Sequence, residues 1–239
     1  MKDVVGSNSE ERRMIKAIQR ATGALDNGYI GNQTMSDIAI NLHADCFPLN
    51  VELYGMPTII AKDINPLNPK GVTPKNGISG SFSDGYQPCS VLIQNGKPLC
   101  WSACHYPQSP ETVLFKKKDG TIHEKRVFHV SQDLPLQDTV WAVGGLGLLD
   151  FYDPRVEGFV GKFSDVLRKT NHTVLGYKNG MLYGIYCKNM NASQVNAFVK
   201  STLKLERAIM LDGGHIAAIN AACNKINTKQ SQLYAIEFL

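Results

Sequence analysis

Three segments of this 239-residue sequence combine glycines with polar side chains, which is a composition suited to ligand binding. They span residues 77–84, 142–149 and 211–215. Glycines after a buried strand let the backbone approach a ligand and direct amides at it. One such segment alone is typical of a tight turn. Three in one chain, the last holding both Asp212 and His215, favour a site for chemistry.

The Asp212 carboxyl is the main candidate for reaction, because it lies between an apolar strand at 205–211 and a glycine turn. His215 follows three residues later and could act as an acid or base near neutral pH. A lone histidine is more often structural, and Asp84 could equally cap a turn.

The elements that must position these groups are mainly strands. Three apolar runs are each broken by a two-residue turn signal, Asn95-Gly96, Asp119-Gly120 and Asn179-Gly180. These pairs supply the positive φ angles of a type I′ turn and predict three β-hairpins. A helix should begin at Asn191 or Ser193, because apolar residues then recur at helical spacing up to Leu203.

Residues 1–45 are expected to form a small helical unit. Ser7 and Glu10 match a capping box, and Asn32 can cap a second helix. Apolar residues recur at i, i+3, i+4 and i+7 in 14–21 and at a similar spacing in 35–42. The predicted class is therefore α+β, with a mostly antiparallel mixed sheet and packed helices in residues 46–239, preceded by the helical unit.

Composition and charge exclude several classes of protein. The net charge of +4 is too diffuse for a nucleic-acid-binding surface. No stretch approaches the ~18 apolar residues of a membrane span. The first residues lack an apolar signal-peptide region, so we expect synthesis in the cytoplasm. The six cysteines favour free thiols over zinc, because the Cys100-x3-Cys104-His105 cluster lacks a partner motif. No metal or other cofactor is predicted, although Asp212, His172 and His215 could form a metal site if they converge.

The segment from about Lys75 to Leu239 resembles the phosphodiester glycosidase family, the N-acetylglucosamine-1-phosphodiester α-N-acetylglucosaminidase-like enzymes. Members show an Asn-Gly-Gly-Phe-Phe-like strand end, an Ala-x-Gly-Gly-like segment, an Arg-Thr-Ala-x-Gly strand and a Leu-Asp-Gly-Gly-Gly-Ser turn. The matching segments here are 79–83, 142–148, 172–176 and 211–217, in the same order. Leu-Asp-Gly-Gly after the predicted helix is the most specific match.

The resemblance implies a hydrolase that cleaves the glycosidic C–O bond of a sugar-1-phosphodiester. Its leaving group is a stable anion, so the main needs are a carboxylate and donors to the phosphate. Asp212 and His215 are the implied catalytic residues. Ten further residues are implied to bind substrate: Ser79, Gly80, Phe82, Asp84, Gly144, Gly145, His172, Thr173, Gly213 and Gly214.

Three positions depart from the family pattern. Ser79 stands in place of Asn, His172 in place of Arg, and His215 in place of the third Gly. Arginine can hold a phosphate with two parallel hydrogen bonds, whereas histidine is a weaker, pH-dependent cation. The phosphate is then held differently, or the substrate differs, or activity is lost.

Residues 15–34 resemble the helical peptidoglycan-binding repeat, with Asn27 inserted in its Asp-Gly pair. Three functions therefore remain open. The first is a hydrolase of a bacterial cell-wall glycopolymer, such as a phage-type lytic protein that reaches the wall after release. The second is a carbohydrate-binding protein without activity. The third is an intracellular hydrolase of a soluble nucleotide- or phosphate-linked sugar. A helical unit that merely packs on the catalytic domain is the plainer interpretation of residues 1–45.

Overall fold

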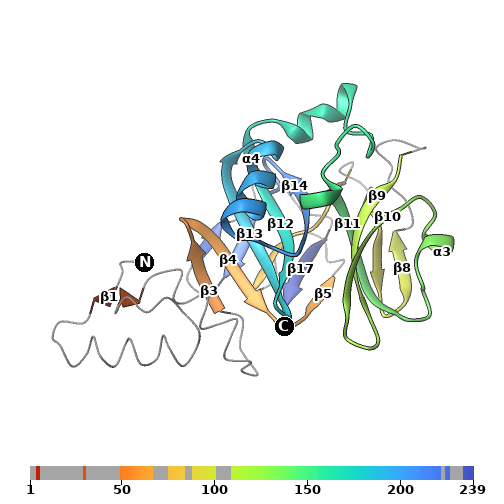
Figure 1. The fold of residues 1–239 in the computed structure, drawn as a ribbon, viewed down its shortest axis with the longest axis horizontal. Helices are drawn as coiled ribbons and strands as arrows, with labels where there is room; N and C mark the ends of the chain where they lie inside the picture. Colours follow the sequence, from red (N-terminus) through yellow and green to blue (C-terminus); the bar gives the residue numbers. More distant parts are fainter. Residues whose placement is uncertain are drawn as a thin grey trace.

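The computed structural model describes residues 4–5, 29–30, 49–66, 75–83, 88–100, 109–221, 224–226 and 234–239. Strands dominate this part of the chain, and every strand pairing within it is antiparallel. Figure 1 shows the strands gathered into two main sheets.

The larger sheet has ten strands, and its main path runs β10-β9-β11-β14-β12-β13-β4-β3, with β7 beside β11 and β8 beside β7. The strands are β3 (Leu49–Leu53), β4 (Met56–Ala61), β7 (Leu92–Gln94), β8 (Lys97–Cys100), β9 (Glu111–Lys117), β10 (Ile122–Val127), β11 (Thr139–Gly147), β12 (Thr170–Lys178), β13 (Met181–Met190) and β14 (Arg207–Gly213).

The smaller sheet has five strands in the order β16-β15-β6-β17-β5, and a separate pair joins β1 to β2. The strands are β5 (Ile64–Pro66), β6 (Gly77–Ser79), β15 (Ile219–Ala221), β16 (Asn224–Ile226), β17 (Ala235–Phe238), β1 (Val4–Val5) and β2 (Tyr29–Ile30).

The three predicted hairpins are confirmed, as β7–β8, β9–β10 and β12–β13. Asn95, Gly96, Asn179 and Gly180 all have positive φ, as the sequence required, and so does Gly120. Local turn chemistry therefore determined where these strands reverse.

The structure has three apolar cores, and the side chains of β14 alternate between two of them on opposite faces of the larger sheet. On β14, Ile209 and Leu211 pack toward the smaller sheet, with Ile78 and Phe238. Met210 packs on the opposite face, with residues of α4 such as Val195. This period of two buries both faces of the sheet. In Figure 1, α4 lies against β12, β13 and β14.

The predicted helix after Asn191 is confirmed. Asn191 caps α4 (Ala192–Ala197) with a capping box that includes Gln194, and the chain continues as the π-helical segment η3 (Phe198–Thr202). The remaining helical segments of the described chain are α3 (Val130–Asp133), η1 (Leu149–Phe151) and η2 (Gly161–Leu167).

The predicted α+β class is wrong. Helical segments in the described chain are few and short, the longest being the continuous run of α4 and η3 over 192–202, whereas large antiparallel sheets form most of it. The reason is that period-two patterns joined by tight turns fill most of residues 49–221, and only one stretch has strong helical spacing.

The helical N-terminal unit that was part of that class has no support. Of residues 1–45, the structure describes only the strand pair 4–5 and 29–30. The predicted helices lie outside the described residues, and the domain boundary at 45/46 stays a prediction. None of the helices in the described chain is long and apolar enough to span a membrane.

Candidate active site

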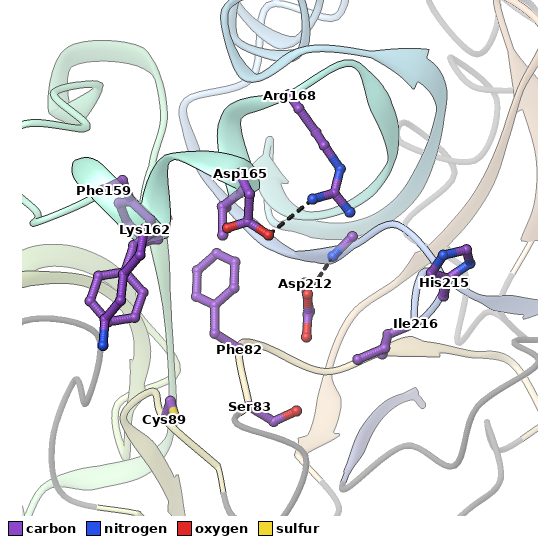
Figure 2. A pocket seen from close by; sticks show the side chains of 13 residues that line it. Phe82, Ser83, Cys89, Phe159, Lys162, Asp165, Arg168, Asp212, His215 and Ile216 are labelled. Atoms are coloured by element: carbon purple, nitrogen blue, oxygen red, sulfur yellow. Dashed lines mark hydrogen bonds and ion pairs between the residues drawn. The ribbon is translucent and has the colours of Figure 1, made fainter.

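A pocket of about 490 Å³ opens at the end of β14, on the face of the larger sheet that carries α4. Figure 2 shows Asp212 near its centre, with Phe82 and Phe159 on one side and His215 on the other. The apolar lining consists of Phe82, Cys89, Phe159, Phe163, Val166 and Ile216. The polar lining consists of Ser83, Lys162, Asp165, Arg168, Asp212, Gly213 and His215.

Asp212 is the second-to-last residue of β14 and directly precedes the glycine turn, as its sequence position predicted. Burial raises the pKa of its carboxyl to about 7, and the negative charge of Asp165 adds to the rise. The Gly213 N–H donates to Oδ1 at 2.7 Å, and this bond and the nearby Arg168 oppose the rise. A carboxyl with a pKa near 7 exchanges its proton readily at neutral pH, which suits an acid or base catalyst.

A buried chain of hydrogen bonds fixes the backbone of Asp212 from below. Thr173 Oγ1 donates its single proton to the Asp212 carbonyl at 3.1 Å, so Ser79 Oγ must be the donor in its 3.1 Å bond to Thr173. Ser79 Oγ in turn accepts from the Ala218 N–H at 3.2 Å. Ser79 and Thr173 are fully buried and do not line the pocket, although both were predicted to bind substrate.

His172 also lies beneath the pocket and not on its lining. Burial lowers the pKa of its imidazole, so the ring is neutral at pH 7, and Nε2 is 3.1 Å from the Arg168 carbonyl. A Cβ on Gly213 would come within 2.6 Å of His172 Nδ1, so only glycine fits above the ring. Gly214 has φ +65°, a conformation that also favours glycine.

The sequence analysis missed the charged residues of η2. Lys162 and Asp165 line the pocket from this 3₁₀ segment, and Arg168 follows directly after it. A 3₁₀ helix has three residues per turn, so side chains at i, i+3 and i+6 form one row. The spacing Lys-x-x-Asp-x-x-Arg was visible in the sequence, but it matches neither the 3.6-residue nor the two-residue period that was sought.

Two paired segments, 82–83 and 88–89, carry part of the pocket lining. Phe82 accepts a hydrogen bond from the Cys89 N–H, and Ser83 pairs with Pro88. The Phe82 ring packs against Phe159 with centroids 5.2 Å apart. Phe82 was predicted to bind substrate and does line the pocket, whereas Asp84 lies outside the described residues.

The remaining predicted glycines pack against the protein's own groups. A Cβ on Gly144 would lie 2.5 Å from the Glu111 carboxyl, and one on Gly145 would lie 2.6 Å from the Met210 carbonyl. A Cβ on Gly80 would collide with the Tyr234 ring at 2.4 Å. These glycines were expected to let the backbone approach a ligand, whereas the groups that approach them in the structure are side chains and backbone of this chain.

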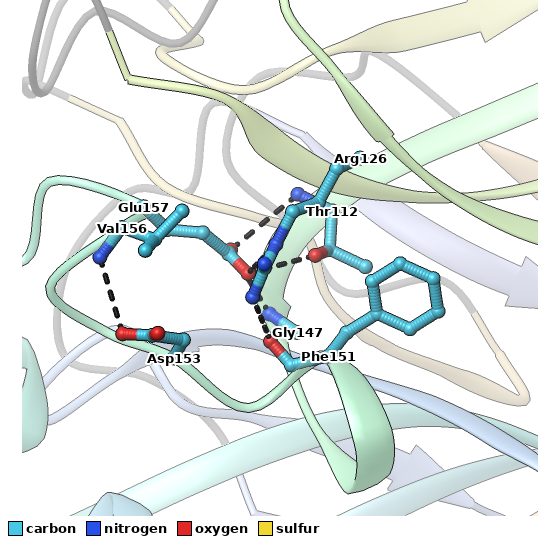
Figure 3. Close-up of polar contacts among 7 residues, drawn as sticks. All are labelled: Thr112, Arg126, Gly147, Phe151, Asp153, Val156 and Glu157. Carbon is cyan, nitrogen blue, oxygen red and sulfur yellow. Dashed lines mark hydrogen bonds and ion pairs between the residues drawn. The ribbon is translucent and has the colours of Figure 1, made fainter.

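Two buried glutamates lie outside the pocket lining, Glu111 on β9 and Glu157 in the loop after η1, where it contacts the end of β11. Burial raises the pKa of Glu111 to about 8 and that of Glu157 to about 7. Glu111 Oε2 accepts from the Val91 N–H at 2.8 Å. Figure 3 shows Glu157 receiving the Thr112 hydroxyl at 2.7 Å and the Gly147 N–H at 3.1 Å, with Arg126 Nε 3.6 Å away. Glu157 thereby fixes the loop that leads to Phe159 in the pocket wall.

Within the described part of the chain, no group of three or more His, Cys, Asp or Glu residues is arranged to hold a metal ion. Asp212, His172 and His215 therefore do not converge into such a group.

Comparison with known proteins gives information on the fold. No family model matches the sequence, and no curated protein matches it. Among solved structures, the catalytic domain of zebrafish N-acetylglucosamine-1-phosphodiester α-N-acetylglucosaminidase, auto-inhibited by its pro-peptide, is similar, with a TM-score of 0.56 and 16% identity over 80% of each chain.

Two bacterial structures are also similar. A protein from Synechocystis has a TM-score of 0.51 and 9% identity, covering 76% of this chain and 59% of that one. A protein from Burkholderia pseudomallei K96243 has a TM-score of 0.50 and 10% identity, covering 77% and 74%. The chain thus shares a phosphodiester-glycosidase-like fold.

Proposed function

We propose that this protein is a hydrolase that cleaves the glycosidic C–O bond of a sugar-1-phosphodiester in the Asp212 pocket. The observation that carries the proposal is the Asp212 carboxyl, which has a pKa near 7 and lines a pocket beside a guanidinium. The fold likeness to the zebrafish catalytic domain supports the same class of reaction.

Asp212 acts in its ionised form in this proposal. The phosphomonoester that leaves is a stable anion and needs little protonation, so the demand falls on the sugar carbon and the attacking water. An ionised Asp212 either accepts a proton from that water or stabilises the oxocarbenium-like centre. His215 also lines the pocket and is exposed, and it is the second residue that we assign to proton transfer.

Arg168 supplies the phosphate contact in this proposal, in place of His172, which the family resemblance implied to bind substrate. The imidazole of His172 is buried and neutral, but its ring nitrogen bonds the Arg168 carbonyl and so supports the arginine from behind. The guanidinium reaches the pocket at the Gly213–Gly214 turn. A planar guanidinium can hold two oxygens of one phosphate.

A hydrolysis assay in H₂¹⁸O tests the reaction class. The substrate is a simple alkyl phosphodiester of N-acetylglucosamine, and the products are analysed by mass spectrometry. Cleavage of the C–O bond places ¹⁸O on the sugar and releases an unlabelled phosphomonoester. Label in the phosphate, or release of sugar-1-phosphate, means P–O cleavage and contradicts the proposal. The rate should rise with pH with a midpoint near 7, because the basic form of Asp212 is required.

The cell-wall target is a separate part of the proposal, and it rests on the resemblance of residues 15–34 to a peptidoglycan-binding repeat. Deletion of residues 1–45 should reduce sedimentation with purified peptidoglycan and leave turnover of the small substrate intact. Unchanged sedimentation would favour the plainer role of a packing unit, while binding without turnover by the full chain would favour a carbohydrate-binding protein.

A further inference from the structure

Arg168, the cation closest to the reacting carboxyl in the proposed mechanism, already has an anionic partner. Its Nη1 lies 2.9 Å from Asp165 Oδ2, and both side chains are more than half exposed. Figure 2 shows this pair at the pocket beside Asp212. The other terminal nitrogen, Nη2, is directed toward the glycine turn, where a Cβ on Gly214 would be 3.3 Å away. Asp165 therefore engages only one arm of the guanidinium.

The backbone keeps the two charges together. Asp165 and Arg168 are three residues apart on a 3₁₀ segment, where such side chains lie one above the other. The Arg168 N–H also donates to the Asp165 carbonyl at 3.1 Å. The pair re-forms easily whenever it is broken, because its partners stay within reach.

The strength of this pair is modest, because both groups face solvent. Exposed pairs of this kind contribute little stability, so a stronger anion can replace Asp165. A phosphate offers two oxygens to the guanidinium, where Asp165 uses one. A phosphodiester carries one negative charge, whereas a phosphomonoester carries about 1.5–2 at pH 7. The product would therefore hold Arg168 more tightly than the substrate does.

We propose that Asp165 is an internal competitor for Arg168. It holds the guanidinium while the pocket is empty, is displaced by the phosphate of the substrate, and returns to promote release of the phosphomonoester product. This inference rests on the proposed function and gives Asp165 a role in selecting and releasing anions.

Binding of inorganic phosphate, measured by calorimetry at low ionic strength, tests this role in the full-length protein. Asp165→Asn should tighten the phosphate Kd about fivefold, the equivalent of losing one exposed competing pair. Arg168→Gln should abolish measurable binding. Asp150→Asn is the matched control, since Asp150 is exposed, pairs with Lys200 and does not line the pocket.

The outcomes separate the inference from the proposed function. If Asp165→Asn binds phosphate no more tightly than the wild type, or if neither binds, Asp165 does not compete and the inference is wrong. Weaker binding by Asp165→Asn would instead make Asp165 a support for Arg168. Either result leaves the hydrolase standing if the ¹⁸O assay succeeds. Phosphate binding that survives in Arg168→Gln would overturn both the inference and the assigned phosphate contact.

A kinetic readout distinguishes competition from a structural role. Product inhibition by a phosphomonoester should strengthen in Asp165→Asn by the same factor as phosphate binding. The pH midpoint of the reaction should move down in Asp165→Asn and up in Arg168→Gln, because Asp165 raises the pKa of Asp212 and Arg168 lowers it. Lys162, His215 and Cys89, the other charged or titratable groups on the pocket, are unchanged in both variants.

Discussion

Among the regions that hold a carboxyl with a raised pKa, two differ in whether a ligand can reach the carboxyl. Asp212 lies on a pocket, and within the described part of the chain its carboxyl has one hydrogen bond, from the Gly213 N–H, with charged groups of η2 nearby. Glu111 and Glu157 are sealed between β9, β11 and the following loop, where strand N–H groups and hydroxyls bind them. Burial is the largest cause of the raised pKa in all three residues. A perturbed carboxyl therefore marks a candidate site only when a ligand can reach it.

Among the variants that test this comparison, Asp212→Asn is expected to have the largest effect, and the effect is on turnover. The amide keeps the size of the side chain and the bond from Gly213 but loses the negative charge. Turnover should fall about 10²–10⁴-fold with little change in melting temperature. Full activity in this variant would move the chemistry away from Asp212, and Asp150→Asn serves as the control because its side chain is 93% exposed.

Arg168→Gln should act mainly on substrate binding. Loss of a charge-assisted contact costs about 1.5–3 kcal/mol, so KM should rise about 10–100-fold with a smaller change in kcat. Lys200→Gln removes an exposed cation outside the pocket and should leave both constants unchanged. A fall in kcat with unchanged KM would instead show that Arg168 acts only in the transition state.

Glu157→Gln should destabilise the buried region where Glu157 joins Thr112 of β9 to Gly147 of β11. The Thr112 and Gly147 N–H groups donate to Oε2, and Arg126 Nε lies 3.6 Å from Oε1, so an amide NH₂ would face an N–H donor whichever way it turns. We expect a loss of about 1–3 kcal/mol in the free energy of unfolding, measured by urea denaturation. A variant as stable as the wild type would show that the carboxylate does not hold the loop before Phe159.

Glu111→Gln should have the smallest effect. Glu111 Oε1 has no hydrogen-bond partner among the described residues, so an NH₂ there meets no opposing donor. At pH 7 the amide replaces a neutral carboxyl, and we expect less than about 1 kcal/mol of change with activity retained.

The pH dependence of stability gives Glu111→Gln a distinct signature. The folded state holds the Glu111 proton more tightly than the unfolded chain, so the free energy of unfolding falls as pH rises from about 4.5 to about 8. That slope should be shallower in the variant, and thermal melts across this range will show it. An unchanged slope would mean that Glu111 is ionised in the native protein at neutral pH.

Local sequence signals predicted the local structure well. Asn95-Gly96 and Asn179-Gly180 specified hairpins because Asn and Gly adopt positive φ more readily than other residues, and both positions of each pair have it. The Asp212 strand end was likewise visible in the sequence, and the structure brings it together with Phe82, Gly213 and His215 on one pocket.

Contacts between segments distant in the sequence could not be predicted from local sequence patterns. Gly144 was expected to admit a ligand, but it admits Glu111, which lies on a neighbouring strand whose register the sequence does not state. Asp165 and Arg168 were missed because the three-residue period of a short 3₁₀ segment was not sought. The α+β class was wrong partly because it relied on helical spacing in residues 1–45, and the described residues of that segment contain no helix.

The hydrogen-bond chain beneath Asp212 has a consequence for folding. It links Ser79 to Thr173 across 94 residues and to Ala218 across 139, whereas the β12–β13 hairpin closes within a few residues. Closing long loops costs more entropy and is slower than forming hairpins, so the pocket floor should form late. During refolding from urea, strand signal in circular dichroism should therefore recover before phosphate binding, and a partly folded chain would carry hairpins without a site.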